Sequence, residues 1–244
     1  MLTLYSYPEL FGVADNNPFG LKVYAFLRLT GLPFIHQHIF DSRQAPHGQL
    51  PYIDDDGIIV GDSSAIIAHL IDRHALTIDD GLSAQQHTQG FCVNRVLDDL
   101  YWAMSYSRWK DDRYWPAFRD AILHAHPNVT AAEMDAARAY NFERYRYQGI
   151  GRYAPEEAYR RGLDDLRAIA GMLDTKPFFF GATPTSIDAS IYGFVANILF
   201  YPIDTPLRAY VVSQPGLVQH CQAMHGRVMG ADDGTSAQRA IAVS

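Results

Sequence analysis

The sequence predicts an α/β domain followed by an all-helical domain. Short β-prone runs alternate with amphipathic helices over the first third of the chain. From about residue 83 onward, apolar residues recur at helical spacing only. Small and polar residues between Leu76 and Leu82 separate the two patterns. We therefore expect domains at residues 1–76 and 83–230, with a flexible tail at 231–244.

The first domain is expected to follow the order strand, helix, strand, strand, strand, helix. The β-prone runs that predict strands cover residues 2–6, 34–40, 48–53 and 57–60. Asn17 and Pro18 indicate the start of the first helix, because Asn is a favoured N-cap and Pro a favoured first helical residue. Gly31 is placed to end that helix. Asp62 or Ser63 then caps the second helix.

The second domain is expected to consist of helices alone. The segments with apolar residues at helical spacing are 84–110, 130–148, 155–174, 186–199 and 215–229. Prolines and glycines predict breaks between these helices, near Pro116 and Pro127 and over residues 149–151, 177–181 and 202–206.

Composition excludes several functional classes. The net charge of -7 and the pI near 5.7 leave no global basic surface for nucleic acid or anionic lipid. No apolar run is long enough for a membrane span, and no signal peptide is apparent. The two cysteines, Cys92 and Cys221, are far apart, which fits a reducing compartment. Two His-x-His pairs lack a third ligand, so no metal site is predicted. We expect a cytoplasmic protein with no nucleic-acid partner.

The most informative stretch, residues 48–53, carries Pro51 at the start of a strand. Proline has no main-chain N–H to donate to the neighbouring strand. It is therefore tolerated at this position only where the N–H side of the strand is unpaired or the peptide bond before the proline is cis. With the turn that follows, the pattern brings a free main-chain amide at Leu50 near the helix start at Asp62 and Ser63. Helix N-termini bind carboxylates through unpaired N–H groups and the helix dipole. Taken singly, these features are also typical of an ordinary hairpin, turn and N-cap.

Together, these features resemble the thioredoxin-like N-terminal domain of the glutathione transferase superfamily. Residues 180–190 are similar to that superfamily's N-capping box, with Thr185 as the cap and Asp188 placed to bond back to its N–H. Segments similar to the bacterial form of the metaxin and failed-axon-connection branch are 17–23, 45–53, 62–64 and 147–152. The resemblance covers the chain from Leu2 to about Gly230. It implies a βαβ-ββα thioredoxin-like domain followed by an all-helical domain.

The resemblance also implies a glutathione site in the first domain and a homodimer. Leu50 would offer its main-chain N–H and C=O to the cysteinyl part of glutathione, and Pro51 would be the cis-proline that exposes them. Asp62 and Ser63 would hold the γ-glutamyl end. Gln49 replaces a lysine associated with this branch, and would donate a hydrogen bond toward the glycyl carboxylate.

The chain departs from the family pattern at the start of the first helix. Related proteins carry Ser or Cys where this chain has Asn17, and the second position of a Cys-x-x-C pair is not cysteine either. Cysteine-based redox chemistry is therefore not supported. The Asn17 side-chain amide is one donor for a thiolate. Tyr7 is the preferred hydroxyl, with Tyr5 and Ser6 as substitutes, and Asn16 is a further candidate in the site.

Two functions remain open. The first is a transferase that conjugates glutathione to a hydrophobic electrophile, with Tyr106 and Trp109 as candidates for the pocket wall. These two residues share one helix face with Trp102, and the other role of such a stripe is packing between helices or subunits. The second function is a non-catalytic member of the fold that binds glutathione, an apolar ligand or a protein partner, in which Tyr7 only packs its loop. The absence of a predicted membrane span argues against a membrane-associated adaptor.

Overall fold

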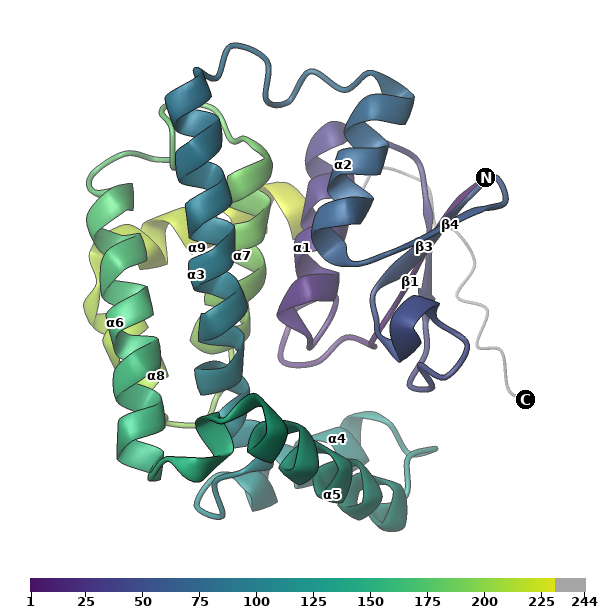
Figure 1. Ribbon diagram of the computed structural model, residues 1–244, viewed down its shortest axis with the longest axis vertical. Helices are drawn as coiled ribbons and strands as arrows, with labels where there is room; N and C mark the ends of the chain where they lie inside the picture. Colours follow the sequence, from purple (N-terminus) through teal and green to yellow (C-terminus); the bar gives the residue numbers. More distant parts are fainter. Residues whose placement is uncertain (231–244) are drawn as a thin grey trace.

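The computed structural model describes residues 1–230 and confirms the predicted fold class (Figure 1). The predicted tail at 231–244 lies outside the described residues. The sheet lies at one side of the molecule. Helices α1 (Pro18–Thr30) and α2 (Ser63–His74) lie between the sheet and the helical half of the chain (Figure 1). The start of each of these helices therefore lies close to the junction between the two halves.

Four strands of the first half form one mixed sheet: β1 (Leu2–Ser6), β2 (Ile35–His38), β3 (Tyr52–Asp55) and β4 (Ile58–Gly61). Their order is β2-β1-β3-β4. The β1–β2 pair is parallel, whereas β1–β3 and β3–β4 are antiparallel. Leu4 and Ile53 are partners across β1 and β3 and are completely buried. This face of the sheet is therefore part of the core.

The third strand begins later than the sequence predicts. A 3₁₀ turn (Pro46–Gly48) occupies the expected start, with positive φ at His47 (58°) and Gly48 (64°), a conformation incompatible with a strand. The chain joins the sheet only at Tyr52. The main chain of Leu50 therefore lies outside the ladder that pairs β3 with β1 and β4.

Seven helices follow in the described chain: α3 (Ala84–Trp109), α4 (Trp115–Ala125), α5 (Ala131–Gln148), α6 (Pro155–Leu173), α7 (Ser186–Leu199), α8 (Pro206–Ser213) and α9 (Pro215–Met229). Helices α4 and α8 were not expected, because Pro116 and Pro206 indicated breaks. Both prolines instead occupy the first turn of a helix, where the missing N–H would have no intrahelical partner.

Helix α7 is the buried centre of the helical half and packs directly on α1. Its Gly193 lies against the α1 main chain, since a Cβ there would come within 2.6 Å of the Pro18 carbonyl oxygen. At its start, Asp188 accepts a hydrogen bond from the Thr185 N–H at 2.8 Å, as the capping box predicted. Asp188 is also hydrogen-bonded to His220 Nε2 at 2.9 Å. Asp188 thus ties the start of α7 to α9.

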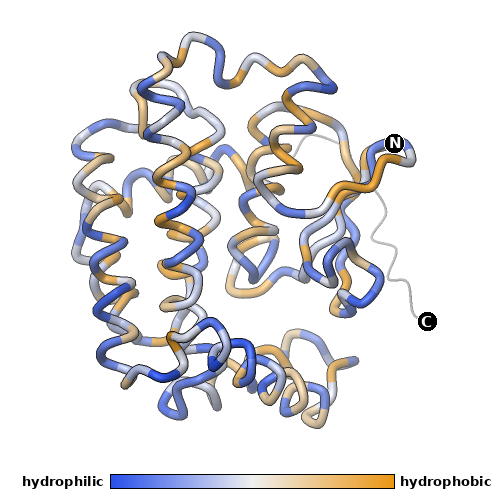
Figure 2. Tube along the Cα trace, in the orientation of Figure 1, coloured by the Kyte–Doolittle hydropathy of each residue, from blue (hydrophilic) through white to orange (hydrophobic). Residues whose placement is uncertain are grey.

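The main core runs from the sheet through α1 and α7 to α6 and α9. A smaller apolar cluster joins the loop after β1 to α4, and includes Leu10, Phe118 and Tyr201. Figure 2 shows hydrophobic and hydrophilic residues alternating in bands along the helices, as expected for helices with one buried face. Within residues 1–230, no helix combines the length and hydropathy that a membrane crossing requires.

Candidate functional site

A cleft of about 140 Å³ lies where the start of α1, the loop before β3 and the start of α2 meet. Its lining residues are Phe19, Pro46, His47, Gln49, Leu50, Pro51, Asp62 and Ser63. The structure therefore brings together the residues that the sequence proposed for the γ-glutamyl, cysteinyl and glycyl contacts. Asn16, Asn17, Tyr7, Tyr106 and Trp109 were also proposed for the site, and they lie outside this lining.

The loop before β3 presents main-chain groups to the cleft. The Leu50–Pro51 peptide bond is cis, as expected, and both residues are buried. Because Leu50 precedes the ladder, its N–H and C=O are not used in pairing with β1 or β4. Gly61 lets this loop lie close to β4, since a Cβ there would come within 2.7 Å of Pro46 Cβ. An N–H and a C=O on one residue are the groups that pair with an extended peptide.

The start of α2 combines a carboxylate with the positive end of a helix dipole. Asp62 caps the helix, its Oδ1 accepting from the N–H groups of Ser64 (2.9 Å) and Ala65 (3.0 Å). Asp62 itself is exposed, so its negative charge is open to a cation. Ser63, the first helical residue, is buried beside it. An ammonium and a carboxylate on one carbon, as in an amino acid, complement this arrangement.

Asn17 is the N-cap of α1. Its Oδ1 accepts from the Phe19 N–H at 3.0 Å, and its own N–H donates to Asp15 Oδ1 at 2.6 Å. The cap uses the oxygen of the Asn17 amide, which leaves the NH₂ group as the donor that the sequence predicts for a thiolate. Asn16 is held differently, because its Nδ2 donates to the Pro8 carbonyl at 2.9 Å. Its amide therefore fixes the loop after β1.

Asp15, which the sequence did not single out, is a buried acid beside the start of α1. It is completely buried, and burial raises the pKa of its carboxyl to about 8, although hydrogen bonds from Ser6 and the Asn17 N–H oppose the shift. A Cβ at Gly20 would lie 1.7 Å from Asp15 Oδ2. Gly20 is the position of the second cysteine in a Cys-x-x-C pair, so the carboxyl fills the space that such a side chain needs. In the sequence, the only indication of this carboxyl is an acidic residue two positions before the Asn17 N-cap.

Arg108 of α3 joins both halves beneath this site. It is buried, and its Nη2 donates to the Asn197 carbonyl (2.8 Å) and Oδ1 (3.1 Å). Its Nη1 donates to the Asn16 carbonyl. Asn197 Nδ2 in turn donates to the Asp15 carbonyl at 3.2 Å. Helices α3 and α7 therefore hold the loop from which α1 begins. These contacts join residues far apart in the sequence, and no local motif predicts them.

Three hydroxyls near the end of β1 were candidates for the thiol donor, and two are engaged elsewhere. The Tyr5 ring stacks on Tyr52 in the sheet, with ring centroids 4.4 Å apart. Ser6 Oγ is hydrogen-bonded to His36 Nε2 at 2.7 Å. Tyr7 is the remaining candidate. Its carbonyl accepts from Ser6 Oγ at 3.4 Å, but its side chain extends away from the sheet toward the helical half.

Tyr7 keeps its proton. Burial raises the pKa of its phenol to about 12, and the neighbouring Tyr101 of α3 adds to the shift, while the Arg144 guanidinium of α5 opposes it. The hydroxyl is therefore a hydrogen-bond donor throughout the neutral pH range. Its ionisable neighbours come from α3, from α5 and from Asp15 in the loop before α1, so the hydroxyl faces the junction between the halves.

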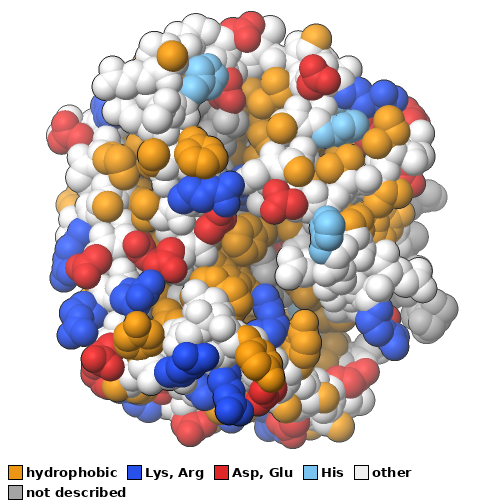
Figure 3. All heavy atoms as spheres, viewed as in Figure 1, with side chains coloured by type: hydrophobic (Ala, Val, Ile, Leu, Met, Phe, Trp, Pro, Cys, Tyr) orange, Lys and Arg blue, Asp and Glu red, His pale blue; other side chains and the backbone are white. Residues whose placement is uncertain are grey.

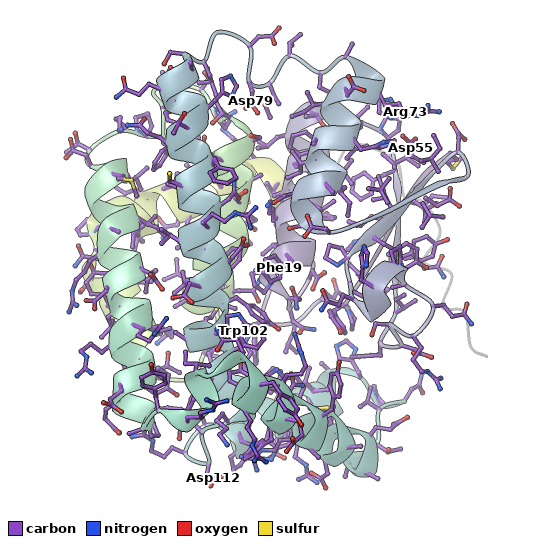
Figure 4. All side chains as sticks on the ribbon, viewed as in Figure 1. Phe19, Asp55, Arg73, Asp79, Trp102 and Asp112 are labelled. Carbon is purple, nitrogen blue, oxygen red and sulfur yellow. The ribbon has the colours of Figure 1, made fainter. Side chains whose placement is uncertain are left out.

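Aromatic and cationic side chains of the helical half form the opposite wall. The Tyr101 ring lies 5.1 Å from the Phe19 ring and 5.4 Å from the Trp102 ring. The Arg144 guanidinium carbon lies 5.4 Å above the Trp102 ring. Figure 3 shows hydrophobic side chains along a furrow between the halves, and Figure 4 shows Phe19 of α1 and Trp102 of α3 on its two sides. An apolar molecule would contact these rings beside the cleft.

Tyr106 and Trp109 lie in helix packing and not in this wall. Tyr106 is buried, and its hydroxyl donates to the Tyr153 carbonyl at 3.3 Å. The Trp109 ring packs on Trp115 and Phe118, with centroids 5.7 and 5.4 Å away. The contacts of Tyr106 and Trp109 are those of the packing role that the sequence left open beside the pocket role. Of the three residues on this helix face, Tyr106 meets α5 and α6 and Trp109 meets α4, whereas Trp102 lies nearest to Tyr101 and the furrow.

Comparison with known proteins identifies the family. Residues 18–114 match the glutathione S-transferase N-terminal domain, and residues 162–224 match the glutathione S-transferase C-terminal domain. The chain is 35% identical over 231 residues to the isoprene-epoxide–glutathione S-transferase of Rhodococcus sp. (strain AD45), covering 91% of this chain and 97% of that protein. This protein belongs to the glutathione S-transferase superfamily.

Other relatives confirm the predicted branch and fold. Failed axon connections of Drosophila melanogaster is 30% identical over 92% of this chain and 57% of its own length. Human metaxin-1 is 24% identical over 81% of this chain and 44% of its own length. The structure of a Methylobacterium radiotolerans glutathione S-transferase, in complex with glutathione sulfonate, is similar with a TM-score of 0.62 at 17% identity. That likeness covers 100% of this chain and 99% of the other.

Proposed function

We propose that this glutathione S-transferase family member binds glutathione in the cleft and conjugates it, through its sulfur, to a small hydrophobic electrophile. The single observation that carries the proposal is the convergence of the Leu50 main chain and the α2 start on one cleft. The relative named for isoprene epoxide suggests that the electrophile is a small epoxide. The apolar wall of Tyr101 and Trp102 suits such a molecule.

Each part of glutathione has a complementary group in the cleft. The γ-glutamyl ammonium would pair with Asp62, and its carboxylate with the hydroxyl and N–H of Ser63 at the positive end of the α2 dipole. The cysteinyl residue would bond to the N–H and C=O of Leu50. Gln49 also lines the cleft and would donate to the glycyl carboxylate.

The chemistry then requires a thiolate and a proton for the alkoxide that the reaction forms. Tyr7 and the NH₂ group of Asn17 would donate hydrogen bonds to the sulfur and so lower the pKa of the thiol. The thiolate attacks one epoxide carbon, a C–S bond forms, and the C–O bond breaks to give an alkoxide. A proton from solvent completes the thioether alcohol, replacing the one the thiol released. The Arg144 guanidinium, on the opposite wall, would stabilise the developing alkoxide.

Steady-state turnover of glutathione with a chloronitroaromatic and with a small 1,2-epoxide tests the proposal. Tyr7→Phe is expected to lower kcat/KM by about 100-fold, because it removes one preorganised donor to the developing charge. Asn17→Ala is expected to lower it as well, by a smaller factor, since main-chain N–H groups remain. Tyr5→Phe is the matched control and should leave turnover unchanged, because that ring stacks in the sheet. If Tyr7→Phe and Asn17→Ala both match wild type, the assignment is wrong.

A second function follows from Asn17 itself. A side-chain amide stands where related transferases have Ser or Cys, so the fold can retain glutathione without activating its thiol. Retention on immobilised glutathione together with no turnover of either electrophile would establish this non-catalytic binding protein instead. Unlike the Rhodococcus relative, failed axon connections and metaxin-1 are not named as transferases.

A further inference from the structure

Lys22 is a buried cation beneath the start of α2. It lies in the second turn of α1 and is only 3% exposed. Its Nζ donates to Ser64 Oγ at 2.9 Å and to Asn94 Oδ1 at 3.2 Å. Ser64 follows Ser63 directly in the first turn of α2. One ammonium therefore joins α1, α2 and α3 immediately behind the cleft lining.

The ammonium has neutral hydrogen-bond partners and no ion pair within residues 1–230. The charges that act on Lys22 come from Asp62 of α2 and from Asp98 and Arg95 of α3. Asp98 is paired with Arg95 at 2.9 Å, and neither Asp98 nor Asp62 is hydrogen-bonded to the Lys22 ammonium within the described residues. Helix α7 meets the Lys22 main chain through Gly193, which carries no charge. A buried charge of this kind normally has an anionic partner.

We propose that Lys22 is a positioning residue for the γ-glutamyl carboxylate of glutathione, whose binding at the α2 start is coupled to protonation of the Lys22 amine. The inference rests on the proposed function, because it assumes that glutathione occupies the cleft. In this arrangement the ligand carboxylate adds a negative charge to those of Asp98 and Asp62, which act on the ammonium without a hydrogen bond to it. Ser64 links the ammonium to the helix start, since its hydroxyl accepts from Lys22 and its N–H donates to Asp62 Oδ1.

The coupling has a definite sign. Burial lowers the pKa of Lys22 to about 8, and the charges of Asp98 and Asp62 oppose the shift. A bound carboxylate favours the protonated amine and raises this pKa. The contribution of Lys22 to affinity is therefore present at pH 7 and lost as the pH rises above 8. A purely structural lysine would contribute equally at both pH values.

Calorimetric titration with S-methylglutathione at pH 7 and pH 9.5 tests the coupling. The methyl group removes the thiol, and the amino group of the probe titrates alike with every variant. Lys22→Met is expected to weaken binding about tenfold at pH 7, equivalent to about 1.4 kcal/mol, and less than about twofold at pH 9.5. Lys22→Arg keeps its charge and should bind more tightly than wild type at pH 9.5. Lys176→Met, on the exposed surface, is the matched control and should match wild type.

The outcomes separate this inference from the proposed function. Equal weakening by Lys22→Met at both pH values overturns the inference alone. Absence of S-methylglutathione binding by wild type overturns the proposed function and the inference with it. If Lys22→Met fails to fold, wild type is titrated at pH 8 with an S-methyl analogue that lacks the amino group, in two buffers of different ionisation enthalpy. Uptake of about 0.4 proton supports the coupling, and no uptake overturns it.

Discussion

The Asp62 carboxylate carries two roles that one substitution can separate. Its Oδ1 caps α2 by accepting from Ser64 and Ala65, and its negative charge is assigned to the ammonium of glutathione. Asp62→Asn keeps an oxygen for the cap and removes the charge. Asp62→Ala removes both, and loss of an N-cap costs about 1 kcal/mol of stability. Asp62→Asn is therefore expected to weaken glutathione binding while leaving thermal unfolding unchanged.

The expected size follows from the exposure of the site. Hydrogen bonds to charged groups contribute about 1.5–3 kcal/mol when buried, and solvent screening reduces this value at an exposed carboxylate. Because Asp62 is exposed, we expect the lower end, a loss of about tenfold in affinity. Calorimetric titration gives the dissociation constants for wild type and Asp62→Asn.

A deaminated glutathione analogue completes a double-substitution cycle. The analogue keeps the γ-glutamyl carboxylate and lacks the ammonium, so it should bind wild type and Asp62→Asn with the same affinity. The reasoning is refuted if Asp62→Asn weakens both ligands equally, because the carboxylate then acts on the helix and not on the ammonium.

Three further predictions concern the support of the site. Asp15→Asn is expected to gain stability relative to wild type as pH rises from 5 to 8, by at most about 1.4 kcal/mol per pH unit. The raised pKa of Asp15, about 8, makes its carboxyl favour the folded state at low pH and lose that effect as pH rises. Urea unfolding at three pH values checks this, and parallel profiles would contradict it. Gly20→Ala is expected to destabilise the fold by about 3 kcal/mol, because its Cβ would overlap the Asp15 carboxyl; an unchanged urea midpoint would show that the site is open. Hydrogen bonds from His69 and His74 outweigh burial and hold the pKa of Asp55 below its ordinary value. Asp55→Asn should therefore lower Tm by about 5 °C at pH 7 and by less as the pH falls below 4, because the unfolded-state carboxylate is protonated there before the folded-state one; equal losses would argue against this.

Local motifs account for what the sequence predicts well. The N-cap at Asn17 and the capping box at Thr185 are each specified within a few residues, whereas the cis bond before Pro51 was implied by the family resemblance. Their geometry depends on short-range hydrogen bonds and backbone preferences, which sequence spacing reports directly. The family resemblance then joined these motifs into one cleft, as the structure has them.

The features that the sequence could not predict depend on contacts between residues far apart in the chain. Lys22 and Arg108 lie on helices whose amphipathic pattern gives no sign that a charge is buried, because the partners come from other helices. The stripe that includes Tyr106 has the right spacing for a pocket wall, but helical spacing does not say which neighbour that face meets. Pro116 was interpreted as a break and proved to begin a helix. The homodimer and the cytoplasmic location stay predictions.

A crystal structure of the protein grown with glutathione tests the central claim most directly. The account predicts that the γ-glutamyl group lies at the start of α2, with its ammonium on Asp62. It also predicts that the cysteinyl main chain pairs with Leu50 and that the sulfur faces Tyr7. Glutathione bound elsewhere, or with its sulfur turned away from both Tyr7 and Asn17, would contradict the account.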